Sequence, residues 1–112
     1  MQKLSIIVSV YNEEGALPYF YKTLKEVVAT LEIEIEIIFV NDGSIDQSLA
    51  ILKEISKEDP SVRIIQFSRN FGHEAAMLAG IDSCRGDVAI CMDADLQHPP
   101  KCIPEMLSHY FK

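Results

Sequence analysis

The chain has 112 residues, of which 48% are hydrophobic and 24% charged, as expected for one globular domain. Its net charge of −7 argues against a general nucleic-acid-binding surface, which would need clustered Lys and Arg. No apolar run approaches the roughly 18 residues of a membrane span, there is no signal-peptide cleavage pattern, and the three cysteines lack zinc-binding spacing, so we expect a cytoplasmic protein.

Four short apolar segments are predicted to form strands. Residues 4–10 are rich in β-branched side chains, which favours a buried strand. Residues 32–40 alternate Glu and Ile and then become continuously apolar, which predicts a strand with a half-exposed start and a buried end. Residues 62–67 and 87–92 complete the set, and in the last of them we expect Cys91 to be a small core residue.

Helical patterns separate these strands. Apolar residues recur at spacings of three and four over residues 17–31, with Pro18 in the first turn. Ser44 and Gln47 predict a capping box for a second helix, which must stop at Asp59-Pro60. A third helix is expected over residues 74–83, and a fourth is expected to begin at the prolines at 99–100.

This alternation predicts an α/β fold: an open, parallel, Rossmann-like sheet of about four strands flanked by helices, with right-handed crossovers. Residues 1–112 form one unit, because no linker, repeat or low-complexity segment interrupts them. The pattern stops abruptly at Lys112, so we expect the chain to be the front part of a larger catalytic domain.

Polar residues follow each predicted strand, and in an open parallel sheet ligands bind beyond these carboxyl ends. The four segments are Tyr11-Asn12-Glu13, Asn41-Asp42-Gly43, Ser68-Arg69-Asn70 and Asp93-Ala94-Asp95. Taken singly, each acidic residue is explained by a turn or a cap. Together they bring four carboxylates to one edge, where like charges repel unless a cation or hydrogen-bond donors gather them.

Asp93 and Asp95, spaced i, i+2 after a buried strand, indicate a site for a hard divalent cation, Mg²⁺ or Mn²⁺. Gln97 offers an amide oxygen within reach of the same cation. The alternative for this segment is a solvated acidic turn. Asp42 could accept a hydrogen bond from a ribose hydroxyl or a uracil N–H, or could only form the turn before Gly43; Tyr11 could stack on a base or be a half-buried aromatic.

Four stretches in this order resemble glycosyltransferase family 2, whose inverting enzymes have a nucleotide-sugar-binding GT-A fold. They are IVSVYNEE at 7–14, FVNDGS at 39–44, SRNFGHEAA at 68–76 and MDADLQHPP at 92–100. Within the family the chain looks most like the transferases that act on dolichyl or undecaprenyl phosphate. Ser9 stands where the family usually has Pro, and His73 where it often has Lys.

The resemblance implies a role for each rim residue. Tyr11, Glu13 and Asp42 would line the base and ribose pocket, Arg69 and Asn70 would lie beside the nucleotide-sugar, and Asp93, Asp95 and Gln97 would hold Mg²⁺ or Mn²⁺ against the diphosphate, with Asp93 also near the substrate. It identifies no catalytic residue, since the acceptor-binding half and the membrane-attaching segments of the family are not matched here.

The implied reaction is inverting transfer of a sugar from a nucleoside diphosphate donor, with a UDP-sugar favoured, to polyprenyl phosphate. The full-length enzyme would work at the cytoplasmic face of the membrane, and these 112 residues would be incomplete for catalysis and able to self-associate through an uncovered apolar edge. Two alternatives stay open: a receiver-type Mg²⁺-binding signalling domain, which would need an Asp where Ser68-Arg69 stands, and a nucleotide-binding module without activity.

Overall fold

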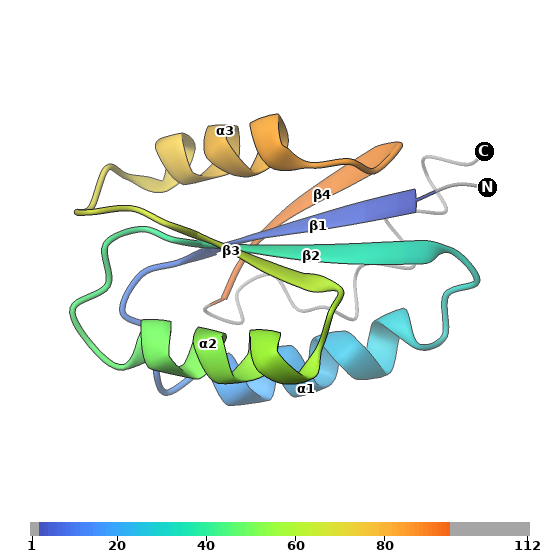
Figure 1. The fold of residues 1–112 in the computed structure, drawn as a ribbon, viewed down its shortest axis with the longest axis horizontal. Helices are drawn as coiled ribbons and strands as arrows, with labels where there is room; N and C mark the ends of the chain where they lie inside the picture. Colours follow the sequence, from blue (N-terminus) through green and yellow to red (C-terminus); the bar gives the residue numbers. More distant parts are fainter. Residues whose placement is uncertain (1–2, 95–112) are drawn as a thin grey trace.

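A computed structural model describes residues 3–94 as a four-stranded sheet with three helices. The elements are β1 (Lys3–Val10), α1 (Leu17–Val28), β2 (Glu34–Asn41), α2 (Ser48–Glu58), β3 (Val62–Gln66), α3 (His73–Ser83) and β4 (Val88–Asp93). All neighbouring strands are parallel, in the order β3-β2-β1-β4 (Figure 1). The predicted open parallel α/β sheet is therefore confirmed.

The helices form layers on both faces of the sheet, with α1 and α2 on one side and α3 on the other (Figure 1). The central strand β1 is buried from Leu4 to Val10, which explains why its sequence is continuously apolar rather than alternating. Because the strands are parallel and Ser9 pairs with both Val40 and Asp93, their carboxyl ends reach one edge of the sheet. We call this edge the rim.

Two apolar clusters hold the layers together. The larger one packs Phe20 and Leu24 of α1 against the sheet side that carries Phe39. The smaller one packs Ala76 of α3 against Ile7 and neighbouring β2 residues on the opposite side. The small side chains of α3 are needed here, since even a methyl group at Gly80 would overlap the side chain of Ile7. The Ala- and Gly-rich sequence of α3 thus lets the helix approach the sheet closely.

Two local predictions were wrong. Cys91 is exposed, because β4 is the edge strand of the described sheet and it is the alternate residues Val88, Ile90 and Met92 that pack into the larger core. The capping box at Ser44 does not form, because α2 begins four residues later and the Ser44 hydroxyl accepts a hydrogen bond from the backbone of Asn12 instead. The helix expected from residue 99 lies outside the described residues.

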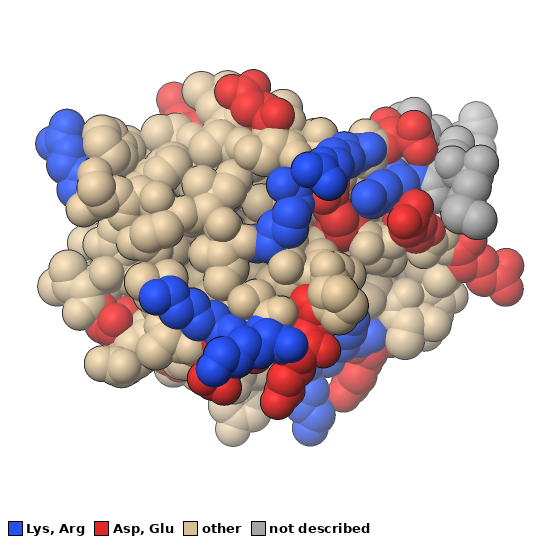
Figure 2. Space-filling model, in the orientation of Figure 1, with Lys and Arg blue, Asp and Glu red and all other residues tan. Residues whose placement is uncertain are grey.

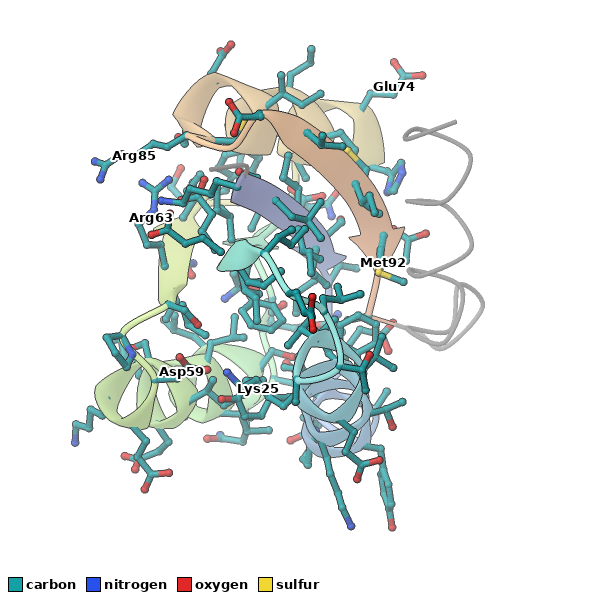
Figure 3. The ribbon with its side chains drawn as sticks, turned by 90° about the vertical axis from the view of Figure 1, so that its right-hand side faces the viewer. Lys25, Asp59, Arg63, Glu74, Arg85 and Met92 are labelled. Atoms are coloured by element: carbon teal, nitrogen blue, oxygen red, sulfur yellow. The ribbon has the colours of Figure 1, made fainter. Side chains whose placement is uncertain are left out.

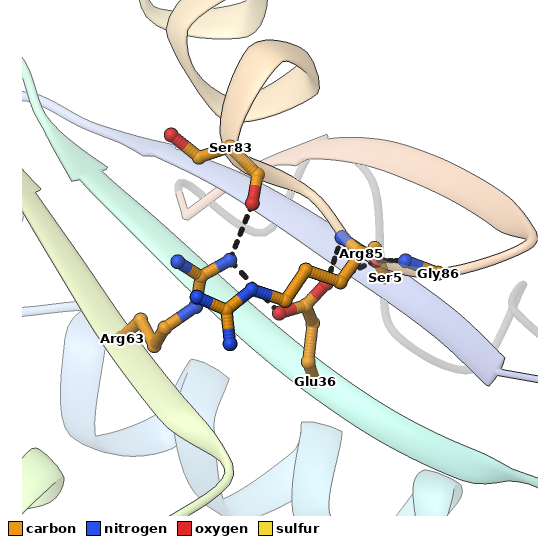
Figure 4. A network of polar contacts seen from close by, with 6 residues as sticks. All are labelled: Ser5, Glu36, Arg63, Ser83, Arg85 and Gly86. Atoms are coloured by element: carbon orange, nitrogen blue, oxygen red, sulfur yellow. Dashed lines mark hydrogen bonds and ion pairs between the residues drawn. The ribbon is translucent and has the colours of Figure 1, made fainter.

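The start of β2 also differs from the sequence pattern, since Glu36 is buried with 5% exposure. Its carboxylate accepts hydrogen bonds from the Arg63 guanidinium at 2.9 Å, the Arg85 N–H at 2.6 Å and the Ser5 hydroxyl (Figure 4). Burial alone would raise the pKa of Glu36, but these donors and the charge of Arg63 lower it below its ordinary value. This network joins three strands to the segment after α3, at the edge opposite the rim.

The outer surface mixes charge with a few apolar residues. On the face shown in Figure 2, Lys and Arg side chains lie next to Asp and Glu side chains. Leu78 and Ile81 of α3 are exposed. Among the described residues, no helix has both the length and the apolar character needed to cross a bilayer.

Candidate functional site

A cavity of about 420 Å³ opens at the rim and receives residues from all four strand ends. Its lining consists of Ser9, Tyr11, Glu13, Asp42, Asn70, Gly72, His73, Asp93 and Ala94. Five of the residues assigned to the donor from sequence are among them, namely Tyr11, Glu13, Asp42, Asn70 and Asp93. The rim cavity therefore lies where parallel-sheet topology predicts a ligand site.

Arg69, the sixth residue assigned to the donor, is not in the lining of the rim cavity. Its guanidinium lies over the ring of Phe71, 4.5 Å from the ring centroid. Phe71 in turn meets Phe67 edge-on, with centroids 5.5 Å apart. These contacts hold Arg69 on the outer side of the loop that precedes α3.

The loops after β1 and β2 form one side of the rim and are bound to each other. Asn12 has a left-handed backbone, with φ of 51°, a conformation in which Asn is the usual non-glycine residue. Four hydrogen bonds of 2.9 to 3.1 Å link the loops: Asn12 N–H to Ser44 Oγ, Ile45 N–H to Asn12 Oδ1, Glu13 N–H to Ser48 Oγ, and Glu14 N–H to Asp46 Oδ2. Tyr11 and Glu13 are thereby held at the mouth of the cavity.

Asp46 is the anion of this junction. Its two carboxylate oxygens accept the N–H groups of Ser48 and Glu14, at 2.9 and 3.1 Å. Burial alone would raise the pKa of Asp46, but these hydrogen bonds lower it. The Asp46 carboxylate thus accepts an otherwise free N–H group at the start of α2. The sequence pattern predicts Ser44 in this role.

Among the rim carboxylates that the structure describes, Asp42 is the most enclosed, with 2% exposure. It accepts hydrogen bonds from Phe71 N–H at 2.7 Å, Gly72 N–H at 3.0 Å and Asn70 Nδ2 at 3.1 Å. The next residue, Gly43, has φ of 73° and packs so tightly against the Arg69–Asn70 peptide that a Cβ atom would overlap it. The turn after β2 and the loop before α3 are therefore interlocked.

On the far side of the cavity, His73 Nδ1 lies 2.9 Å from Asp93 Oδ1. This contact joins the first residue of α3 to the last residue of β4. This contact could not be predicted from the sequence, because the two residues are far apart in the chain and a His at a helix start is usually a surface or capping residue. Their pairing depends on how the α3 start is placed over the sheet edge.

The proposed metal ligands are only partly described. Asp93 lines the rim cavity, whereas Asp95 and Gln97 lie outside the described residues. Within residues 3–94, no group of three or more His, Cys, Asp or Glu side chains is close enough to hold a metal ion. Of the three proposed metal ligands, the described residues thus include one, the Asp93 carboxylate, an oxygen donor of the type that Mg²⁺ and Mn²⁺ prefer.

Comparison with known proteins assigns the family. The model of glycosyl transferase family 2 matches residues 5–112. The chain belongs to glycosyltransferase family 2. It is 50% identical over 106 residues to the uncharacterized glycosyltransferase YkcC of Bacillus subtilis, covering 95% of this chain and 33% of that protein.

Two further relatives have names that state a reaction. The chain is 44% identical over 108 residues to the prophage bactoprenol glucosyl transferase homolog of Escherichia coli, covering 96% of this chain and 35% of the relative. It is 43% identical over 109 residues to the undecaprenyl-phosphate 4-deoxy-4-formamido-L-arabinose transferase of Pseudomonas fluorescens, covering 96% and 32%. The chain thus spans about a third of the length of the curated relatives it matches.

Solved structures of low sequence identity share the fold. S. aureus TarS 1-349 in complex with UDP-GlcNAc superposes with a TM-score of 0.74 at 20% identity, over 97% of this chain and 31% of the TarS 1-349 chain. The mannosyltransferase PcManGT from Pyrobaculum calidifontis, in complex with GDP-Man and Mn²⁺, gives 0.72 at 18% identity, over 82% and 27%. These matches support the predicted glycosyltransferase fold.

Proposed function

We propose that the rim cavity binds a nucleoside diphosphate sugar, with a UDP-sugar favoured. The observation that carries the proposal is the convergence of Tyr11, Glu13, Asp42, Asn70 and Asp93 on one cavity in a family 2 chain. TarS, which shares this fold, has been solved with UDP-GlcNAc. A receiver-type signalling domain is no longer a candidate, because the family model matches residues 5–112.

The nucleoside would lie against the side of the cavity formed by the β1 and β2 loops. Tyr11 is 44% exposed and presents an aromatic ring on which a base can stack. Glu13 and Asp42 are the carboxylates of this side, and Asn70 brings an amide from the third loop. Arg69 contributes positive charge near the nucleotide-sugar from outside the lining.

The diphosphate would lie at the other side, near Asp93 and the start of α3. A divalent cation held by Asp93, Asp95 and Gln97 would neutralise charge on the departing diphosphate. The carboxylate of Asp93 fits this use, since it lies in the cavity and can supply an oxygen ligand. His73, which contacts Asp93, also lines the cavity and can donate a hydrogen bond to a phosphate oxygen there.

The acceptor of the whole protein would be polyprenyl phosphate at the cytoplasmic face of the membrane. Support comes from relatives whose names describe transfer to bactoprenol and undecaprenyl phosphate. A phosphate oxygen of the acceptor would attack the anomeric carbon while the bond from that carbon to the diphosphate oxygen breaks. Direct displacement inverts the configuration, and it needs no strong general base because the phosphate is already ionised near neutral pH.

Calorimetric titration tests donor binding and its metal dependence. The protein is titrated with UDP-glucose, UDP and GDP, each in excess Mn²⁺ and again in EDTA. We expect the uridine nucleotides to bind more tightly in Mn²⁺, because the cation bridges the carboxylates and the diphosphate. Equal affinity in Mn²⁺ and EDTA would contradict the metal bridge, and the absence of binding for every nucleotide would contradict the proposed function.

A further inference from the structure

The carboxylate of Asp42 accepts hydrogen bonds from three donors within the protein. Phe71 N–H binds one oxygen, and Gly72 N–H and Asn70 Nδ2 bind the other. The Asn70 amide also donates to the Asp42 main-chain carbonyl at 3.2 Å. A carboxylate has about four acceptor positions, so most of the capacity of Asp42 is used by the protein itself.

All three donors belong to the loop that leads into α3. Gly72 is the residue before the first turn of α3 and has φ of 103°, a conformation that L side chains rarely adopt. The two backbone N–H groups that bind Asp42 are therefore the groups that fix where this helix begins. The next residue is His73, whose Nδ1 lies 2.9 Å from Asp93 Oδ1.

We propose that Asp42 is a positioning residue for the diphosphate side of the site. Its carboxylate fixes the backbone of residues 70–72 and so places His73 against Asp93. That the ligand is a nucleoside diphosphate sugar rests on the proposed function, whereas the fixing of residues 70–72 by Asp42 does not depend on it. Asp42 therefore affects ligand binding through the loop and α3, in addition to any contact with the nucleoside.

An Asn side chain at this position tests the proposal with almost no change in shape. In Asp42→Asn, one carboxylate oxygen becomes an NH₂ group that faces N–H donors and cannot accept from them. We expect the Phe71 and Gly72 amides to exchange hydrogen about tenfold faster in the variant, because their hydrogen bonds to a charged acceptor are weakened. Unchanged exchange at both amides would overturn the proposal.

Ligand affinities separate positioning from direct contact. Uridine diphosphate and inorganic diphosphate are titrated in Mg²⁺ into the natural protein and the variant. If Asp42 acts through the loop, both ligands lose affinity by a similar factor, about tenfold. A loss for UDP with unchanged diphosphate affinity would show that Asp42 acts by touching the nucleoside, and would overturn the proposal.

Asp87→Asn is the matched control. The Asp87 carboxylate also accepts a backbone N–H, from Lys3 at 2.8 Å, but lies at the edge opposite the rim. We expect this variant to bind both ligands as the natural protein does; an equal loss in Asp87→Asn would overturn the specific role of Asp42.

A second variant covers the case in which Asp42→Asn does not fold. Asn70→Ala removes the side-chain contacts with Asp42 from the loop side, and hydrogen exchange is its readout, because Asn70 itself lines the cavity. Faster exchange at Phe71 and Gly72 supports the proposal, and unchanged exchange at both amides overturns it. If the natural protein binds neither ligand, the proposed function fails, while the exchange data still decide whether Asp42 holds the loop.

Discussion

At the scale of single residues, the rim depends on three unusual backbone conformations. Asn12, Gly43 and Gly72 have φ of 51°, 73° and 103°, and each lies in a loop that follows a strand. Such conformations turn the chain sharply after a strand and allow its N–H groups to reach side chains of a neighbouring loop. The shape of the cavity is therefore set largely by backbone geometry.

Alanine substitutions of three glycines should separate backbone strain from steric overlap. Gly15→Ala should be nearly neutral, because Gly15 has no close neighbour and no unusual φ. Gly72→Ala adds strain in open space, which costs about 1–3 kcal/mol of unfolding free energy. Gly43→Ala adds the same strain and an overlap with the Arg69–Asn70 backbone, so it should be the most destabilising.

Chemical denaturation measures the unfolding free energy of the three variants. A Gly43→Ala protein as stable as Gly15→Ala would contradict the interlock between the second and third loops. Nucleotide affinity should fall in the same order, because both strained positions shape the rim cavity.

The sequence predicted which residues lie at the rim but not how they are bound to one another. Tyr11, Glu13, Asp42, Asn70 and Asp93 could be assigned because each follows a predicted strand. The hydrogen bonds of Asp42 and the contact between His73 and Asp93 could not, because they depend on a helix start placed by tertiary packing. Asp42 was read as a ligand contact or a turn former, and the structure shows a third use, which is to hold a neighbouring loop.

At the scale of elements, Asp59 connects both helices of one layer to β3. It follows α2, and its carboxylate accepts from Tyr21 Oη at 2.6 Å and lies 2.8 Å from Lys25 Nζ, both on α1 (Figure 3). It also accepts from the N–H and hydroxyl of Ser61, just before β3. Burial alone would raise the pKa of Asp59, but the hydrogen bonds from Lys25, Ser61 and Tyr21 lower it well below its ordinary value.

This cluster should make stability depend on pH at both extremes. The folded-state pKa of Asp59 is lowered. Its contribution to the unfolding free energy is therefore present above the ordinary pKa of 3.8 and is lost as pH falls below that value. Burial raises the pKa of Tyr21, and the hydrogen bond to Asp59 raises it further. The contribution of Tyr21 to the unfolding free energy is therefore present below the ordinary pKa of 10.0 and is lost as pH rises above that value.

We expect Asp59→Asn to cost about 1–3 kcal/mol at neutral pH, because the donors around this buried position lose a charged acceptor. Thermal unfolding across pH should show that the stability difference between the natural protein and Asp59→Asn shrinks below the ordinary Asp pKa. Tyr21→Phe should remove the loss of stability that the natural protein shows as pH rises above the ordinary Tyr pKa. Glu54→Gln is the control, since Glu54 lies 3.6 Å from Lys57 in an exposed pair that contributes little. A deficit for Asp59→Asn that stays constant down to low pH would show that the carboxylate charge does not stabilise the fold.

Most element boundaries followed from periodicity, and the exceptions have physical causes. Asp59-Pro60 ends α2 as predicted, because Pro cannot continue a helix. The start of α2 was misplaced because the N–H acceptor is Asp46 and not Ser44. Alternation at the start of β2 suggested that Glu36 is half exposed, yet Arg63 and Arg85 approach it from other elements and allow its burial.

At the scale of the whole molecule, the 112 residues correspond to about a third of the length of the named relatives. The described residues supply the rim cavity, which we propose as one face of the donor site, and two apolar clusters that hold the sheet and helices together. Exposed Leu78 and Ile81 on α3 fit the expectation of self-association, which stays a prediction.

The last prediction concerns what residues 1–112 do when purified alone. We expect them to bind a UDP-sugar in Mn²⁺ without transferring the sugar to polyprenyl phosphate. Much of the acceleration in a two-substrate displacement comes from holding both reactants in line, and effective molarities of about 10⁵–10⁸ M are available only to a protein that binds both. Slow donor hydrolysis remains allowed, because water needs no binding pocket.

A radiolabelled sugar donor and a short-chain polyprenyl phosphate in detergent make the measurement direct. Label should stay in the aqueous phase with residues 1–112 and enter the lipid phase with a full-length relative such as the Escherichia coli homolog, which serves as the positive control. Asp93→Asn of residues 1–112 should further remove Mn²⁺-dependent donor binding, which ties the retained function to the rim cavity. Transfer by residues 1–112 at a rate near that of the full-length relative would show that they hold the acceptor as well, and that the donor and acceptor sites are not divided as proposed.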